Sequence, residues 1–256
     1  MARAAVLRGL SWRVATVVGV RDETAAGRTI VFELPGWPGH AAGQHVDVRL
    51  TAPDGYSTQR SYSIASAPGG DLVELTVERL PDGEVSPYLT QVLSVGDQIE
   101  LRGPIGGWFV WDDASPDPVL LIAGGSGVVP LAAMVRARFA VGSSAPFRLL
   151  YSVRDPASLL FGAELDHYQR TDLSFGVHLA FTRTAPADVP RPVGRIDAAF
   201  LTDATAGGPF SAPDAPAVFA CGPTGFVEAV ANLVVAAGHE ARRIKTERFG
   251  PSGSQR

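Results

Sequence analysis

The hydrophobic pattern of this chain changes once, across Trp111–Pro118, and this change constrains the fold more than any other feature. Before it, short runs rich in β-branched and aromatic residues alternate with turn sequences. After it, longer apolar runs alternate with helical patterns. A length of 256 residues is comfortable for two domains. We therefore read Trp111–Pro118 as a linker and predict domains over residues 1–113 and 114–256.

The first domain is predicted to be a small antiparallel β-barrel. Turn sequences containing proline, aspartate and glycine separate its strands, at the spacing typical of such barrels. One helix is expected after the fifth strand, with Ser86 as its N-cap and Pro87 at its first position. The six predicted strands are Trp12–Val20, Thr29–Leu34, His45–Leu50, Arg60–Ala65, Leu72–Arg79 and Gln98–Leu101.

The second domain is predicted to be a doubly wound parallel α/β sheet. Its first strand, Val119–Ala123, is a continuous apolar run, as expected for a strand buried on both faces. Strands and helices then alternate in the βαβ rhythm of this fold class. The further strands are Phe147–Val153, Val177–Thr182, Ala217–Ala220 and Ala241–Glu247, and the helices are Val128–Phe139, Leu159–Tyr168 and Phe226–Ala237.

Composition and charge exclude several classes of function. The net charge of −4 argues against nucleic-acid binding. One cysteine cannot form an intrachain disulfide or hold an iron–sulfur cluster, and the five histidines lack metal-ligand spacing, so no metal site is predicted. The uncharged window Pro118–Val135 contains a glycine turn and Pro130, which favours a strand, turn and helix over a membrane span. Arginines interrupt the N-terminal apolar residues, so we expect no signal peptide and a cytoplasmic protein.

The run Arg60-Ser61-Tyr62-Ser63 is the first candidate for a binding site. On a strand, Arg60 and Tyr62 share one face and the two serines share the other. A guanidinium can hold a phosphate bidentately, and a tyrosine ring offers a flat surface to another ring. The run therefore suits a ligand with a diphosphate and a planar heterocycle. A solvated arginine and a packed tyrosine on an edge strand are the alternative.

A second candidate lies between a strand and a helix, at Gly124-Gly125-Ser126-Gly127. A diphosphate at such a turn can meet free N–H groups and the helix dipole. The turn lacks the last glycine of Gly-x-Gly-x-x-Gly, whose place Pro130 takes, and it lacks the lysine of a P-loop. A tight turn without a ligand is the alternative.

Two further motifs follow apolar strands of the second domain. Ligands of open α/β sheets bind outside the carboxyl ends of the strands, which places Cys221-Gly222-Pro223 near a nicotinamide. A lone cysteine is nevertheless more often a small buried hydrophobe. Thr182-Arg183 ends the third strand, where arginine accommodates a ribose 2′-phosphate, and Arg154 could assist.

Together these runs resemble the ferredoxin–NADP reductase superfamily, over roughly Trp12–Phe249. Arg60-Ser61-Tyr62-Ser63 looks like its flavin motif, and Gly83-Glu84-Val85-Ser86 looks like its turn over the FAD diphosphate. Gly125-Ser126-Gly127 with Pro130, and Cys221-Gly222-Pro223, look like its pyridine-nucleotide motifs. The resemblance implies an N-terminal barrel that binds FAD and a C-terminal sheet that binds NADPH or NADH.

The resemblance also implies roles for individual residues of the flavin site. Arg60 would hold the flavin diphosphate, Tyr62 would stack on the isoalloxazine, and Ser63 would hydrogen-bond near N5, the atom that accepts hydride. Gly83, Val85 and Ser86 would complete the diphosphate site. Ser61 and Val77 are included among the cofactor-binding positions.

On the nucleotide side, the glycine turn with Gly222 and Pro223 would bind the dinucleotide, with Cys221 beside the nicotinamide. Thr182-Arg183 resembles the Ser-Arg pair of NADP-dependent members. Glu247-Arg248-Phe249 looks like the family's terminal Glu-x-aromatic, in which the aromatic covers the flavin and the glutamate lies near the proton path. Phe249 replaces a tyrosine, and Gly250–Arg256 continues past it.

The expected function is a stand-alone FAD-dependent oxidoreductase, because neither a fused cysteine-rich ferredoxin domain nor a globin is evident. NADPH, or NADH, would give hydride to FAD, and electrons would leave to a separate ferredoxin or oxygenase component. A monomer is expected. Two alternatives stay open: an electron-transfer subunit that is inactive alone, and a flavin-free pyridine-nucleotide dehydrogenase.

Overall fold

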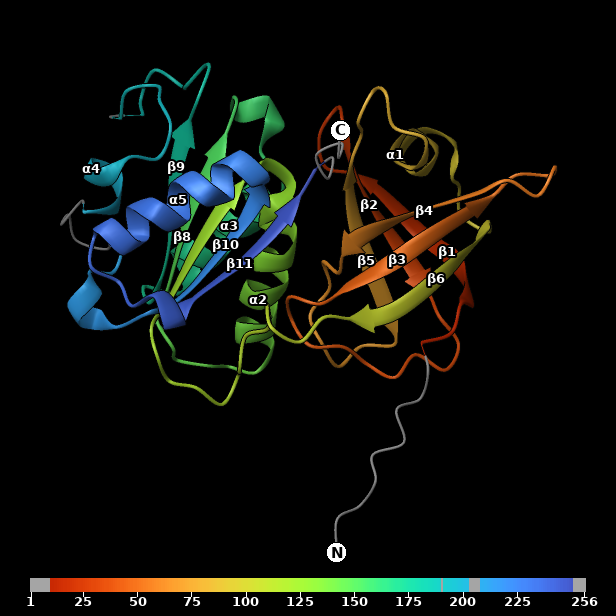
Figure 1. The fold of residues 1–256 in the computed structure, drawn as a ribbon, viewed down its shortest axis with the longest axis horizontal. Coiled ribbons are helices and arrows are strands. Elements are labelled where there is room, and N and C mark those ends of the chain that lie inside the picture. The colour runs from red at the N-terminus through yellow and green to blue at the C-terminus, as the bar shows by residue number, and fades with distance from the viewer. Residues whose placement is uncertain (1–9, 190, 203–207, 251–256) are drawn as a thin grey trace, which may run out of the picture.

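The computed structural model describes residues 10–189, 191–202 and 208–250, which form two lobes side by side (Figure 1). The first lobe is built from six antiparallel strands in the order β4-β3-β6-β1-β2-β5. The strands are β1 Arg13–Asp22, β2 Gly27–Glu33, β3 His45–Thr51, β4 Ser57–Ser63, β5 Leu72–Glu78 and β6 Gln98–Ile105. Every predicted strand of this domain is present, within a few residues of its expected bounds.

The sheet curls into a barrel because its two edge strands meet. Just past β4, an isolated bridge joins Ile64 to Leu75, and the Ala65 N–H donates to the Glu74 carbonyl at 2.7 Å. Alternate residues of the strands fill the interior, which is typical of a small barrel. Ile30, Phe32, Val46 and Leu75 are completely buried there.

The second lobe is a parallel sheet in the order β11-β10-β7-β8-β9. Its strands are β7 Val119–Gly124, β8 Phe147–Val153, β9 Phe175–Phe181, β10 Ala217–Pro223 and β11 Ile244–Phe249. Helices α2 Val128–Ala140 and α3 Gly162–Thr171 pack on one face, and α4 Ala198–Leu201 and α5 Thr224–Ala236 pack on the other. The predicted antiparallel barrel and doubly wound parallel sheet are both confirmed.

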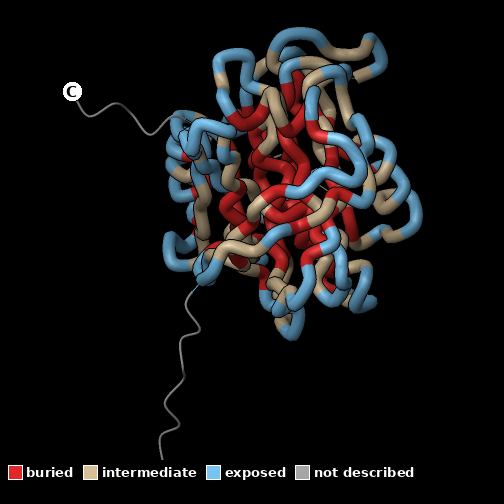
Figure 2. The backbone as a smooth tube through the Cα atoms, turned by 90° about the vertical axis from the view of Figure 1, so that its right-hand side faces the viewer, coloured by how far each residue is buried: buried red, intermediate tan, exposed pale blue. Residues whose placement is uncertain are grey.

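The expected linker is not a free connection. Trp111 is buried and packs edge-on against Phe147, with 5.2 Å between ring centroids, and Phe109 packs in the same way on Phe219 at 5.4 Å. Both rings belong to the apolar cluster beneath α2, which also includes Ala42 of the barrel lobe. The two lobes therefore share buried residues, and Figure 2 shows buried backbone in the interior with exposed backbone around it. The boundary between residues 113 and 114 falls in the segment between β6 and β7 and stays a prediction.

Candidate functional site

Pairing between β3 and β4 fixes which way the Arg60–Ser63 run points. Tyr62 lies opposite Val46, and Arg60 lies opposite Val48. Directly opposed residues of an antiparallel pair share a face, so Arg60 and Tyr62 lie on the side of the barrel core. On the other face, the Ser61 hydroxyl donates to Asp47 Oδ1 at 2.7 Å. The two faces follow the predicted alternation, and Ser61 is bonded to a protein carboxylate.

Arg60 and Tyr62 differ in how far they are exposed. The Arg60 side chain is half-exposed, and its Nη2 lies 3.7 Å from Glu84 Oε2. Its Nη1 donates to Thr58 Oγ1 at 3.2 Å. Its guanidinium thus lies beside the turn before α1 Val85–Pro87, where the diphosphate is expected. Tyr62 is half-buried, and burial raises the pKa of its phenol to about 12, against a smaller lowering by Arg60. The ring is therefore neutral and partly packed on the barrel core.

The predicted N-cap at Ser86 is wrong. The helix begins at Val85, Glu84 occupies the N-cap position, and a π-helical turn Tyr88–Val92 continues it. The Ser86 hydroxyl instead accepts a hydrogen bond from the Leu80 N–H at 3.0 Å and is buried. It therefore closes the preceding turn rather than capping the helix.

Two of the proposed flavin contacts are deep in the barrel core. Val77 and Val85 are each 1 % exposed. Their side chains are therefore closed to a cofactor outside the barrel. Gly83 keeps the turn tight, because an added Cβ would lie 2.9 Å from the Ser86 hydroxyl and 3.1 Å from the Leu80 carbonyl oxygen.

The glycine turn after β7 is shaped largely by packing. A Cβ on Gly124 would lie 2.7 Å from the Phe226 ring, and one on Gly127 would lie 2.2 Å from the Cys221 carbonyl oxygen. A Cβ on Gly222 would also lie 2.7 Å from the Phe226 ring. Gly125 is different, since its φ of +55° lies in the left-handed region and an added Cβ would meet Glu78 Oε2 of the barrel lobe at 3.9 Å, an ordinary contact distance. The turn Gly125–Gly127 leads directly into the 13-residue helix α2.

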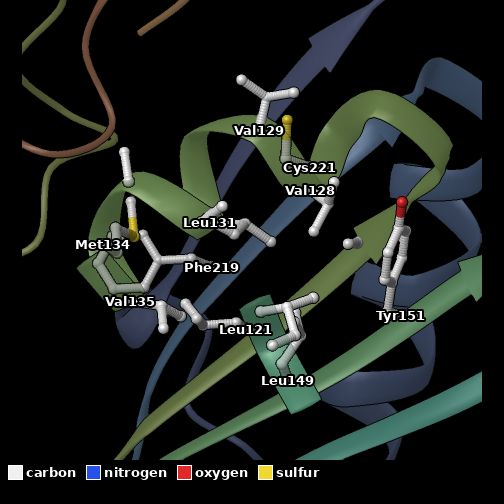
Figure 3. Close-up of a cluster of buried hydrophobic side chains, with 14 of the residues drawn as sticks. Leu121, Val128, Val129, Leu131, Met134, Val135, Leu149, Tyr151, Phe219 and Cys221 are labelled. Carbon is white, nitrogen blue, oxygen red and sulfur yellow. The ribbon is translucent and has the colours of Figure 1, made fainter. Parts of the chain in front are cut away.

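Cys221 lies inside the core rather than on an open surface. It is 1 % exposed, and its sulfur lies beside Val128 and Val129 of α2 (Figure 3). Burial raises the pKa of this thiol well above its ordinary value, and the charge of Glu247 adds to the effect. The thiol is therefore neutral and enclosed, which matches the buried-hydrophobe alternative. Contact with a nicotinamide stays a prediction.

The carboxyl end of β11 reaches the barrel lobe (Figure 1). Glu247 pairs with Cys221 in the sheet register, and its Oε1 lies 3.9 Å from Nδ1 of His45 on β3. His45 is the cross-strand partner of Ser63. The end of the nucleotide-domain sheet and the last serine of the β4 motif therefore meet at one place, the junction of Ser63, His45 and Glu247.

The electrostatics of this junction are set by burial. Burial raises the pKa of Glu247 to about 7. It also lowers the pKa of His45, against a smaller raising effect of Asp47. Glu247 Oε2 is enclosed and has no hydrogen-bond partner among the described residues. A buried oxygen without a donor is costly, so this carboxyl can hold a proton near neutral pH.

The remaining predicted residues lie along the carboxyl edge of the parallel sheet. Phe249, 37 % exposed, is the sheet partner of exposed Pro223. Thr182 is half-buried and donates its hydroxyl to the Val153 carbonyl at 3.2 Å, whereas Arg183 is exposed. The backbone N–H of Arg183 donates to the Arg154 carbonyl at 2.9 Å, which brings the two arginines to adjacent strand ends. Residues 251–256, which continue the chain past Phe249, lie outside the described residues.

Sequence reasoning missed two residues of this region. His45 carried no metal-ligand spacing and was assigned no role, yet it faces Glu247. Glu78, at the end of β5, pairs with Arg154 across the two lobes at 3.2 Å. No local pattern marks either residue, because both contacts depend on how one domain seats against the other. Within the described residues, no cluster of three histidine, cysteine or acidic side chains could hold a metal ion, and no helix is both long and apolar enough to cross a membrane.

Comparison with known proteins identifies the class to which this fold and site belong. An oxidoreductase FAD-binding domain model matches residues 17–110, and an oxidoreductase NAD-binding domain model matches residues 121–232. The chain belongs to the ferredoxin–NADP reductase superfamily, which confirms the resemblance seen in its motifs.

Similar proteins include a curated reductase and solved flavoprotein structures. The chain is 33 % identical over 211 residues to the glycine betaine monooxygenase reductase subunit of Chromohalobacter salexigens, covering 81 % of this chain and 55 % of the relative. It thus spans just over half the length of that relative.

Two solved structures share the fold. The FAD/NAD-binding domain of nitric oxide dioxygenase from Vibrio cholerae has a TM-score of 0.81 at 24 % identity, covering 93 % of this chain and 99 % of that one. A ferredoxin NADP+ reductase from Neisseria gonorrhoeae, solved with FAD and NADP bound, has a TM-score of 0.78 at 21 % identity. The match covers 93 % of this chain and 98 % of that one.

The residues present fit both groups that the family implies. The Gly125–Gly127 turn offers backbone N–H groups, and the helix α2 that follows it offers its dipole, to a dinucleotide diphosphate. On the barrel, the half-exposed guanidinium of Arg60 and the neutral ring of Tyr62 suit the diphosphate and ring system of FAD. Between them, the buried Glu247 Oε2 lacks a donor that a bound ligand could supply.

Proposed function

We propose that this chain is an FAD-dependent oxidoreductase that takes hydride from NADPH, or NADH, and passes electrons to a separate acceptor. The observation that carries the proposal is the junction of Ser63, His45 and Glu247, where the flavin motif of the barrel meets the carboxyl end of the nucleotide-binding sheet. FAD would supply the chemistry, by accepting hydride and releasing electrons singly. The protein residues would bind, orient and exclude water.

The roles of the barrel residues follow from their positions. Arg60 would hold the FAD diphosphate from its place beside the turn before α1, and Tyr62 would offer its neutral ring to the isoalloxazine. Val77, Gly83, Val85 and Ser86 would shape the backbone that the cofactor meets, since three of these side chains are buried or engaged within the protein. Ser63 would hydrogen-bond at the reacting edge of the ring, and Phe249 would cover its other face.

The preference for NADPH rests on the charges at the carboxyl edge of the parallel sheet. Arg154 and Arg183 lie on adjacent strand ends, and guanidinium groups bind phosphate strongly. The diphosphate of the nucleotide would lie on the Gly124–Gly127 turn, and Gly222 and Pro223 would flank its nicotinamide half. Thr182 would support Arg183 through its hydrogen bond to β8.

The proposed acceptor is a ferredoxin or an oxygenase component. The similarity to a monooxygenase reductase subunit supports the second choice. We also propose a cytoplasmic location, as expected for a protein that draws on reduced nicotinamide nucleotide. The alternative in which the chain is an electron-transfer subunit, inactive without a fixed partner, would be favoured by its copurification with that partner.

The proposal is tested by the visible absorption spectrum of the purified protein, recorded before and after anaerobic addition of NADPH. A yellow protein that bleaches supports both domain assignments. Bleaching by NADH alone would keep the reaction class and contradict the preference for NADPH. A colourless protein that added FAD leaves unchanged would contradict the proposal.

A further inference from the structure

The ion pair between Glu78 and Arg154 lies beside the glycine turn of the proposed nucleotide site. Glu78 is the last residue of β5 in the barrel lobe, and Arg154 follows β8 in the parallel sheet. Arg154 Nη2 lies 3.2 Å from Glu78 Oε1, so the pair bridges the two domains. The two side chains are 51 % and 29 % exposed, so both groups are open to an incoming ligand.

The second oxygen of Glu78 faces the glycine turn. A Cβ built on Gly125 would come 3.9 Å from Glu78 Oε2, and Gly125 is the residue of that turn with the left-handed backbone. The Glu78 carboxylate therefore lies against the turn that offers backbone donors to a diphosphate. The same carboxylate also pairs with Arg154. An anion at this turn meets a like charge and an arginine that is already engaged.

We infer that the carboxylate of Glu78 competes with the dinucleotide diphosphate for Arg154, and so sets the affinity for the pyridine nucleotide. The inference rests on the proposed function, because it assumes that the glycine turn binds a dinucleotide. Binding breaks the contact between domains at Glu78, and release of the oxidised nucleotide restores it. Glu78 thereby weakens nucleotide binding and favours release of the product.

Removing this charge while keeping the shape of the side chain gives a direct test. Glu78→Gln frees Arg154 and removes the like charge from the turn, so NADP+ should bind roughly three- to tenfold more tightly, the effect of one partly screened charge pair. The measurement is calorimetric titration of the FAD-loaded oxidised protein with NADP+ and, separately, with NAD+. Both nucleotides carry the diphosphate, so binding of both should tighten. The factor should be larger for NADP+, because the freed Arg154 lies beside Arg183, where the 2′-phosphate is proposed to bind.

Glu74→Gln is the matched control. Glu74 is on the same strand and also faces across the domains, 3.5 Å from Arg136, but no contact places it near the glycine turn. The Glu74→Gln variant should bind either nucleotide with the affinity of the wild type. In an Arg154→Gln background, Glu78→Gln should lose most of its effect, because the arginine for which it competes is gone.

The outcomes separate this inference from the function on which it rests. A wild type that binds neither nucleotide would overturn the proposed function, and this inference with it. A wild type that binds, with Glu78→Gln unchanged or weaker, would overturn the role of Glu78 alone. Equal tightening in Glu74→Gln would do the same, because the effect would then follow net charge rather than position.

Discussion

Glu247 is a carboxyl group that the fold partly buries at the place where the two domains meet, with Oε2 enclosed. Burial raises its pKa to about 7, so the folded protein retains a proton that the unfolded chain releases near pH 4.5. A group whose folded pKa is raised contributes stability below its unfolded pKa and loses it as pH rises through the folded value. The stability contributed by Glu247 should therefore decline between about pH 4.5 and pH 7.

Glu247→Gln should remove this decline, because an amide resembles the protonated acid and does not titrate. The difference in unfolding free energy, variant minus wild type, should rise across that window by about 2–3 kcal/mol. Urea unfolding at several pH values measures it. His45 titrates with the opposite sign, since burial lowers its pKa. Because His45 faces Glu247, the same comparison in a His45→Gln background removes its contribution. A difference independent of pH would contradict the burial of this carboxyl.

Arg183 is the residue on which the choice of nucleotide is proposed to depend. Arg183→Glu should raise KM for NADPH on the order of 10- to 100-fold, because it replaces a guanidinium–phosphate contact with repulsion. KM for NADH should change far less. Arg170→Glu is the control, since Arg170 is exposed in the last turn of α3, just before β9 begins, and should leave both values unchanged. Equal effects of Arg183→Glu on both nucleotides would contradict the 2′-phosphate assignment.

Among the elements, the turn from β7 into α2 is held by backbone contacts that a side chain would disrupt. Gly127→Ala should destabilise the protein by about 3 kcal/mol or more, since its Cβ would lie 2.2 Å from a carbonyl oxygen of β10 that cannot move aside. Gly225→Ala is the contrast. Gly225 is exposed within α5 with open space around it, so alanine should stabilise by about 0.5–1 kcal/mol. Denaturant midpoints measure both.

The elements themselves were largely predictable from the sequence. Alternating apolar residues located the six barrel strands, and continuous apolar runs located the buried parallel strands, because burial dictates both patterns. The start of α1 was misplaced, since the same Ser-Pro pair serves a helix cap or, as here, a bond from Ser86 to the Leu80 N–H. Only the position of Leu80 in three dimensions decides between the two.

The candidate site was predictable only within each domain. The Arg60–Ser63 run and the glycine turn carry their chemistry in consecutive residues. His45 and Glu78 do not, because each acquires its partner from the other lobe. Burial of Cys221 is the expected state of a lone cysteine, whereas the close approach of α2 to β10 that encloses it depends on tertiary packing.

On the scale of the whole molecule, Arg136 of α2 joins the two lobes. Its guanidinium donates to Glu164 of α3 at 2.7 and 2.6 Å, and also to the carbonyl of Ala65 in the barrel at 2.7 Å. The side chain is 11 % exposed, so these bonds are shielded from water. Loss of one partner from such a set leaves buried polar groups unpaired.

Arg136→Met should therefore loosen the barrel closure near Ala65. We expect amide hydrogen exchange around Ile64–Ser66 to become roughly 5- to 30-fold faster, the factor that corresponds to 1–2 kcal/mol. Exchange measured by mass spectrometry resolves this segment. Arg138→Met is the control, because Arg138 is buried and its bonds to described residues stay within the second lobe, at Ala145, Ser174 and Asp172. Faster exchange at Ile64–Ser66 in both variants would contradict a bridging role for Arg136.

The position of Glu247 on β11 has a consequence for the order in which the molecule is made. Domains fold from the N-terminus during synthesis, so the barrel and the first four parallel strands leave the ribosome before β11 does. Until that last described strand pairs with β10, His45 has no Glu247 opposite it. A barrel that already binds its cofactor would thus be incomplete at the reacting edge while the chain is still growing, and the junction would form only after Glu247 has left the ribosome.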